Sequence, residues 1–315
     1  MENRLIVTAS PHITDMVDTQ RLMGNVVISL IPCVVASAVI FGMRALALEA
    51  VTVAACVFFE WLYTKLMKKP NPVADLSAVV TGLILALNFP VSLPYWIAVV
   101  GAFVSIVLVK QLFGGIGMNF ANPALVGRLV LFSGFATRMT TWTYPDAAVD
   151  QLASATPLQV QNVYRLDLWD LFLGIHGGVL GEVCALACLM GFVWLVFTKT
   201  ISPAIPVTYV LTVFVCSWIA EGDIEYGLIA ILSGGLLFGA IFMATDYVTS
   251  PFTLKGKLAF GLFMGVVTFA IRYWGSLAEG VSYAILLGNL ITPYINKLTM
   301  QTPLGYVKPA KKGGN

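Results

Sequence analysis

The stretch 22-LMGNVVISLIPCVVASAVIFGM-43 decides the class of fold. Its residues carry no charge, and as a helix they would extend over roughly 33 Å, enough to cross the hydrocarbon core of a bilayer. Similar segments recur along the 315 residues, of which 58% are hydrophobic and 11% charged. Since a soluble domain carries roughly a quarter charged residues, the composition excludes an ordinary soluble protein and predicts an all-α polytopic membrane protein. The net charge of +2 is too small to indicate nucleic-acid binding.

Charged residues, prolines and glycines divide the chain into about ten predicted membrane helices. They cover roughly residues 22–43, 46–66, 73–89, 93–113, 121–137, 178–198, 203–221, 226–246, 257–275 and 279–297. The two sets of five resemble each other in short stretches, such as 81-TGLIL-85 and 233-SGGLL-237. An odd number of spans per copy places the second copy upside down in the membrane, so we predict a 5+5 inverted repeat.

This division gives five parts of the chain. They are an N-terminal segment 1–21, a first repeat 22–137, a connecting loop 138–177, a second repeat 178–298 and a tail 299–315. With the N-terminus in the cytoplasm, thirteen lysines and arginines fall on the cytoplasmic side and four on the other. By the positive-inside rule both termini are then cytoplasmic and the loop 138–177 is extracytoplasmic. We expect the basic tail to attract anionic membrane lipid.

Two polar stretches lie at the ends of predicted spans. In 114-GGIGMNFANPALVGR-128, the amides of Asn119 and Asn122 can hydrogen-bond the planar edge of a ligand, or the stretch can serve as a helix cap with glycine packing. In 244-ATDYVTSPF-252, Asp246 is an ionisable residue at membrane depth and therefore a functional candidate. It can equally cap the loop before Pro251.

Other polar residues favour structural roles. Asp75 and Ser77 follow Pro72 at a predicted helix start, where helix capping is the better interpretation. The two histidines, His12 and His176, do not form a catalytic set. The five cysteines all fall in apolar runs and are expected to be packing residues, so no metal site is predicted.

The predicted loop contains 150-DQLASATPL-158, which resembles the flavin-attachment motif of the membrane subunits RnfD and NqrB. In that motif an aspartate precedes, by six residues, a threonine that follows alanine. Asp150, Ala155 and Thr156 match, while Ala153 and Ser154 stand where the family prefers serine or threonine and then glycine.

The resemblance covers nearly the whole chain, and the matching segments occur in the same order. They are 10-SPH-12, 75-DLSAVVTGLILALNFP-90, 114-GGIGMNFANPAL-125, 244-ATDYVTSP-251 and 280-GVSYAILLGN-289. The short N-terminal segment is more similar to RnfD than to the longer-armed NqrB.

The resemblance implies that Thr156 carries FMN through a phosphoester bond installed by a flavin transferase. The small neighbours Ser154 and Ala155 leave the hydroxyl accessible to that enzyme. Arg138 and Arg165, which are close to Thr156 in the sequence, can neutralise the phosphate. For Thr156 taken alone, an exposed loop threonine or a helix N-cap is the alternative.

A second flavin is also implied. Asparagines of the GxNxxNP type lie near non-covalent riboflavin in NqrB-like proteins, and Asn119 and Asn122 match them on the predicted cytoplasmic side.

The implied activity is that of an electron carrier in an ion-translocating ferredoxin:NAD⁺ oxidoreductase (Rnf) complex of a prokaryotic cytoplasmic membrane, coupled to Na⁺ or H⁺. The chain has no plausible NAD site or iron–sulfur motif, so partner subunits with iron–sulfur centres and a second flavin are expected to complete the enzyme. Candidate residues for the ion path are Asn119, Asn122 and Asp246.

Three alternatives remain open from the sequence. They are an NqrB-type subunit of an Na⁺-translocating NADH:quinone reductase, a structural subunit without flavin, and a flavin-free solute channel or secondary transporter.

Overall fold

The computed structural model describes residues 18–69, 73–141, 168–174, 176–275 and 280–300. All regular structure within these residues is helical, which confirms the predicted all-α class. In the first half, the helices are α1 (Thr19–Phe41), α2 (Met43–Leu66), η1 (Val73–Asp75), α3 (Ser77–Leu87), α4 (Tyr95–Phe103), η2 (Val104–Gln111), α5 (Pro123–Gly134) and α6 (Ala136–Met139). They are followed by α7 (Leu168–Leu173), α8 (Ala185–Phe197), α9 (Ala204–Glu221), α10 (Ile224–Leu232), α11 (Leu236–Phe238), η5 (Gly239–Met243), α12 (Leu254–Trp274) and α13 (Val281–Thr299).

Each of the ten predicted spans contains helix, but several are broken or shorter than expected. Among the described residues, α1, α2, α9 and α12 are long and apolar enough to cross a membrane. The pair formed by α10 and Leu236–Met243 would make a fifth span, bent by 65°. The protein is therefore a membrane protein by composition and helix length, while the count of ten spans stays a prediction.

The third and sixth predicted spans show why hydropathy misplaced some helix starts. The third, predicted over 73–89, begins as the short 3₁₀ turn η1, and α3 starts only at Ser77 after Leu76 adopts a left-handed backbone with φ 62°. The sixth, predicted over 178–198, becomes helical only at Ala185. Residues 178–183, the first part of this predicted span, are buried without being helical. Such backbone is tolerated at membrane depth only where protein surrounds it.

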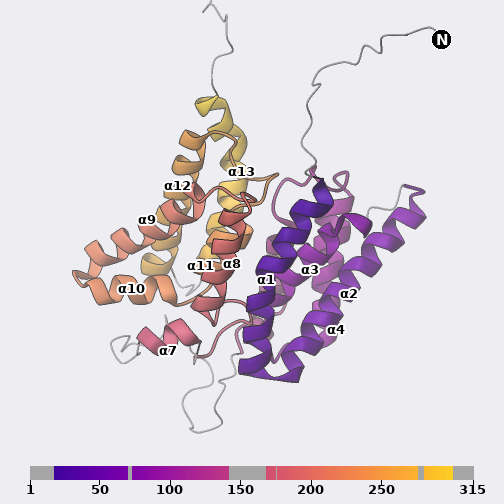
Figure 1. Ribbon diagram of the computed structural model, residues 1–315, viewed down its shortest axis with the longest axis horizontal. Coiled ribbons are helices and arrows are strands. Elements are labelled where there is room, and N and C mark those ends of the chain that lie inside the picture. Colours follow the sequence, from indigo (N-terminus) through magenta and orange to yellow (C-terminus); the bar gives the residue numbers. More distant parts are fainter. Residues whose placement is uncertain (1–17, 70–72, 142–167, 175, 276–279, 301–315) are drawn as a thin grey trace, which may run out of the picture.

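The helices form two groups that lie side by side (Figure 1). One group contains α1 to α5, and the other contains α8 to α13. Helices α1 and α8 pack directly against each other where the two groups meet. Gly191 permits this approach, because a Cβ atom there would lie 2.5 Å from the Ser29 carbonyl oxygen. Small residues at such contacts let membrane helices come close together.

Inside the second group, α9 and α12 make the closest packing through the GxxxG pair Gly261 and Gly265. A Cβ atom added at Gly265 would meet the Thr212 Cβ atom at 2.5 Å. Next to this seam the buried Tyr209 hydroxyl lies 2.6 Å from that of Thr268. This hydrogen bond gives both hydroxyl groups a partner, which the hydrocarbon of a bilayer cannot supply.

The start of α1 and the end of α13 lie at the same edge of the molecule, and α7 lies at the opposite edge (Figure 1). Helix α7 follows the segment 142–167, which lies outside the described residues. The two ends of the helical body are thus on the side away from the entry to α7.

Candidate functional site

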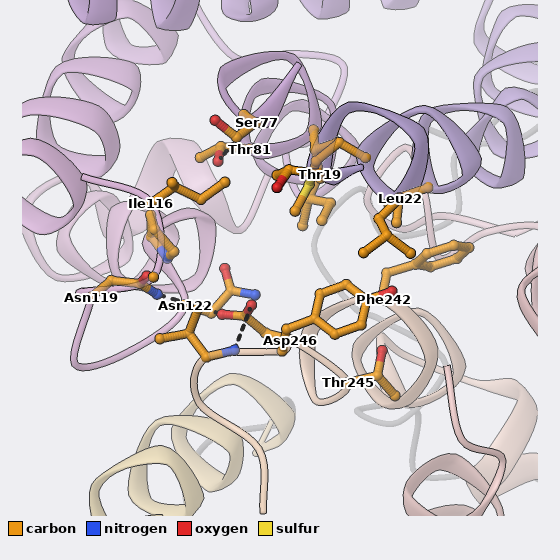
Figure 2. A pocket seen from close by; sticks show the side chains of 18 of the residues that line it. Thr19, Leu22, Ser77, Thr81, Ile116, Asn119, Asn122, Phe242, Thr245 and Asp246 are labelled. Atoms are coloured by element: carbon orange, nitrogen blue, oxygen red, sulfur yellow. Dashed lines mark hydrogen bonds between the residues drawn. The ribbon is translucent and has the colours of Figure 1, made fainter. Parts of the chain in front are cut away.

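A cavity of about 380 Å³ lies where the two groups of helices meet, near the start of α1. Its wall is mainly apolar, with Leu22, Ile116 and Phe242 among the lining residues. The polar side chains that line it include Ser77, Thr81, Lys110, Asn119, Asn122 and Asp246. Figure 2 shows Ser77 and Thr81 on one side of the cavity and Asn122 and Asp246 on the other. Both π-helical segments, η2 and η5, contribute residues to this cavity. Such segments are frequent at functional sites.

The glycine-rich stretch after η2 brings the two asparagines to the cavity. Gly114, Gly115 and Gly117 have φ values of 125°, 98° and 86°, which residues with a side chain rarely adopt. The chain can therefore turn sharply before Asn122, which has the extended backbone that a following proline favours.

Asn122 caps α5, as one of the two interpretations of the sequence predicted. Its Oδ1 atom accepts hydrogen bonds from the backbone N–H groups of Ala124 at 3.0 Å and Leu125 at 3.3 Å. Its Nδ2 group donates to the carbonyl of Met243 in η5 at 3.3 Å. The same side chain thus begins one helix and holds the two halves together at the cavity.

Asp246 meets Asn119 across the cavity floor. The Asn119 Nδ2 group donates to Asp246 Oδ2 at 3.5 Å and to the Ala121 carbonyl at 2.9 Å. Asp246 also accepts from the Thr249 hydroxyl at 3.2 Å and from the Val248 N–H at 3.4 Å. The carboxylate therefore caps its own loop and contacts the first half as well.

Tyr247 links the loop after η5 to the segment between α8 and α9. Its hydroxyl donates to the Thr200 carbonyl at 2.5 Å. Burial, assisted by the negative charge of Asp246, raises the pKa of the Tyr247 phenol to about 12. The phenol thus keeps the proton that makes this contact.

A buried charged cluster stands behind the opposite wall. The Lys110 Nζ atom lies 2.6 Å from Glu60 Oε1 and 2.6 Å from the Ser77 hydroxyl oxygen. Gln111 donates to the same Glu60 oxygen at 2.8 Å. Ser77 in turn donates to Asp75 Oδ1 at 2.5 Å, and the same oxygen accepts from the Ser77 N–H. Asp75 therefore caps one N–H group of the first turn, while Leu76 is the N-cap residue of α3.

The sequence interpretation missed this cluster. It counted Lys110 among the charges at the cytoplasmic ends of helices, but the side chain is only 4% exposed and lines the cavity. The signal was present, since Glu60 and Lys110 both lie within predicted apolar spans. Charges at that depth usually pair with each other or have a function.

A second polar group lies deeper between the halves. Arg128 donates to Asn88 Oδ1 at 2.6 Å, and Asn88 donates to the Ile84 carbonyl at 2.6 Å. A Cβ atom at Gly235 would lie 2.6 Å from Glu182 Oε2 and 3.7 Å from Arg128 Nη1. The break between α10 and α11 therefore leaves room for both charged side chains.

Of the remaining predicted site residues, only Arg138 lies in the described part of the chain, and it does not line this cavity. Arg138 is exposed on α6. Asp150, Ser154, Ala155, Thr156 and Arg165 lie outside the described residues, so their predicted roles stay predictions.

The arrangement is suited to an amphipathic ligand. Ligand pockets in proteins usually measure about 300–1,000 Å³ and combine apolar walls with a few convergent polar groups. Here a cationic donor on one wall and amide and carboxylate groups on the other can bind the polar edge of such a ligand.

Comparison with known proteins gives a consistent family assignment. The model of the NQR2, RnfD, RnfE family matches residues 6–305. The chain is 41% identical to the D subunit of the Na⁺-translocating ferredoxin:NAD⁺ oxidoreductase complex of Acetobacterium woodii, over 99% of this chain and 98% of that protein. It is 35% identical to the D subunit of the proton-translocating ferredoxin:NAD⁺ oxidoreductase complex of Clostridium ljungdahlii, over 96% and 97%.

A third relative is the D subunit of the ion-translocating oxidoreductase complex of Mannheimia succiniciproducens, 32% identical over 95% of this chain and 98% of that protein. The family predicted from the flavin-attachment stretch and the ordered segments is thereby confirmed. The chain belongs to the NQR2, RnfD, RnfE family.

Proposed function

We propose that this chain is the membrane electron-carrier subunit of an ion-translocating ferredoxin:NAD⁺ oxidoreductase, and that it passes electrons through FMN attached covalently to Thr156. The observation that carries the proposal is the similarity, over almost the whole length of both chains, to relatives named as D subunits of such complexes. Their names favour this function over a role in a quinone reductase. The motif 150-DQLASATPL-158 supplies the attachment residue.

The cavity supports a second, non-covalent flavin, which we propose to be riboflavin. Its volume and largely apolar wall fit a planar ring system. Lys110 offers an N–H donor, and Asp246 offers an acceptor, for the polar edge of the ring. A bound flavin supplies the electron-transfer chemistry, while the protein fixes its position and tunes its electronic state.

The helix packing supports the proposed 5+5 inverted repeat. In the first half α2 packs against both α3 and α4, and in the second half α9 packs against both α10 and α12. These are corresponding pairs if the second and seventh spans are equivalent. A binding cavity where the halves meet is typical of such repeats.

The orientation and the ion path are further parts of the proposal. With the start of α1 and the end of α13 in the cytoplasm, the Thr156 loop faces the opposite side of a prokaryotic cytoplasmic membrane, where the flavin transferase acts. We place the path of Na⁺ or H⁺ along Asn119, Asn122 and Asp246, because an electron that moves to an interior flavin attracts a cation. Other subunits with iron–sulfur centres and flavin would supply and accept the electrons.

Intact-mass analysis tests the covalent flavin directly. The full chain is co-expressed with its flavin transferase and compared with Thr156→Val and with the matched control Thr143→Val, a substitution in the same loop. We expect an added mass of one FMN moiety in the parent chain and the control, and its loss in Thr156→Val.

Two results would count against the proposal. A parent chain without the added mass would exclude covalent FMN and favour the flavin-free channel, which solute flux into vesicles would then examine. An adduct that persists in Thr156→Val would place the flavin on another residue.

A further inference from the structure

Lys110 presents a positive charge to the cavity from a rigid support. Its ammonium group is held by two oxygen acceptors, Glu60 Oε1 and Ser77 Oγ, each at 2.6 Å. An ammonium group has three N–H donors, so these two contacts leave one donor for a molecule in the cavity that Lys110 lines.

The counter-ion stands behind the ammonium rather than beside the ligand. Glu60 is fully buried, and it is not among the residues that line the cavity. Gln111 donates to the same carboxylate oxygen and fixes it further. The pair therefore has the positive end of its dipole toward the cavity, and this field is strong because the surroundings are poorly polarisable.

The charge on the facing wall is weaker. Asp246 carries the negative charge on that side of the cavity, and its carboxylate accepts hydrogen bonds from Asn119, Val248 and Thr249. It is also more exposed than Lys110. These donors reduce the effect of its charge on the interior of the cavity.

We infer that Lys110 sets the redox preference of the cavity, because its ammonium group favours the electron-rich reduced form of a bound flavin ring over the oxidised form. The inference rests on the proposed riboflavin in this cavity. No covalent bond to Lys110 forms or breaks, and the electrons come from the redox partners of the complex. A group that only shapes the cavity would bind both forms equally and leave the potential unchanged.

The test measures the midpoint potential of riboflavin bound to the purified full chain. All samples carry Thr156→Val, so that no covalent flavin contributes to the spectrum. The variant Glu60→Gln/Lys110→Met removes both charges and leaves an acceptor for Gln111. Lys110→Arg retains the charge, and Ser105→Ala is a control that removes a buried hydroxyl of η2 outside the cavity lining.

We expect the double variant to lower the ratio of reduced-form to oxidised-form affinity at least tenfold, which is about 30 mV for a two-electron couple. In Lys110→Arg and Ser105→Ala this affinity ratio should stay within a few-fold of that of the parent chain.

If the double variant does not fold, Ser77→Ala replaces it in the test. This substitution keeps both charges but removes one acceptor that positions Lys110, and it should shift the affinity ratio several-fold. An unchanged potential in the folded variants would overturn the inference while leaving the riboflavin site intact. Failure of the parent chain to bind riboflavin would overturn both.

Discussion

Asn119 and Asp246 are 127 positions apart in the chain, yet the Asn119 amide donates to the Asp246 carboxylate at 3.5 Å. One residue follows the glycine turn after η2, and the other follows the π-helical segment η5. Their contact closes the floor of the cavity between the two halves. A carboxylate at this junction is positioned to respond to the charge of a ligand and to attract a cation.

Substitution of Asp246 by asparagine tests whether its carboxylate attracts the translocated cation. Asp246→Asn keeps the size of the side chain and one oxygen, which can accept from the Val248 N–H. It removes the negative charge and the second oxygen, to which Thr249 and Asn119 donate. We expect the number of ions moved per NAD⁺ reduced to fall about tenfold, because the path loses the carboxylate that attracts the cation. The measurement is ion uptake into inverted vesicles, with the exposed Glu225→Gln on α10 as control. An unchanged ratio would remove Asp246 from the ion path.

Removing one charge of the Glu60–Lys110 pair is predicted to cost much more stability than removing both. Lys110→Met leaves the fully buried Glu60 carboxylate without its counter-ion, which typically costs about 3–5 kcal/mol. Removing both charges with Glu60→Gln/Lys110→Met should recover most of that loss, because a buried pair replaced as a unit is often nearly neutral. Denaturant unfolding in mixed micelles gives the free energies.

Lys65→Met serves as the control for this pair. Lys65 is exposed and lies over the Trp61 ring at 4.7 Å, a contact worth no more than about 1 kcal/mol. Equal losses in Lys65→Met and Lys110→Met would contradict the importance of the buried pair.

The α9–α12 seam predicts a second contrast, between two glycines. Gly265→Ala places a Cβ atom 2.5 Å from the Thr212 Cβ atom, so the helices must separate, at a cost of about 1–3 kcal/mol. Gly24 in α1 has no atom within 4 Å of an added Cβ, and Gly24→Ala should be neutral or stabilise α1 by up to about 1 kcal/mol. Thermal unfolding of both variants in the same detergent measures the difference in stability. An unchanged melting temperature in Gly265→Ala would mean that α9 and α12 pack less tightly than the 2.5 Å approach at Gly265 implies.

The parts that sequence reasoning predicted rest on local patterns. Long, predominantly apolar runs identified α1, α2, α9 and α12, because a stretch of about 20 such residues rarely forms anything but a membrane-spanning helix. The Asn-Pro step placed the start of α5, since proline fits the first turn and asparagine caps it. The family segments predicted the asparagines and Asp246 as functional residues, and the structure gathers them around one cavity.

The parts that it missed depend on partners far away in the chain. A hydropathy average over a whole span is little affected by one charged residue. Glu60 and Lys110 were therefore not recognised as a pair, although they are 2.6 Å apart in the fold. The start of α8 at Ala185, seven residues later than predicted, was missed for a related reason. Most residues between 178 and 184 are apolar or glycine and are buried by the protein, and composition alone cannot distinguish such a buried loop from a helix.

His176 provides a pH-dependent prediction outside the membrane helices. It lies in the loop between α7 and α8 with 4% exposure. Burial lowers the pKa of its imidazole from 6.5 to about 4, while a hydrogen bond with the backbone of Asp170 opposes that shift. The folded chain therefore binds fewer protons at this site than the unfolded chain between pH 4 and 6.5. Stability must fall as the pH decreases through that window.

The expected loss from this one residue is about 2 kcal/mol between pH 7.5 and pH 5. His176→Gln cannot gain a proton and should remove that part of the slope, whatever it does to stability at pH 7.5. The chain has one other histidine, and His12→Gln provides the matched control that should retain the slope. Thermal unfolding in detergent at a series of pH values distinguishes the variants. If the parent chain and His176→Gln lost stability in parallel, His176 would have an ordinary pKa, and its loop would have to be open to water rather than packed against the helices.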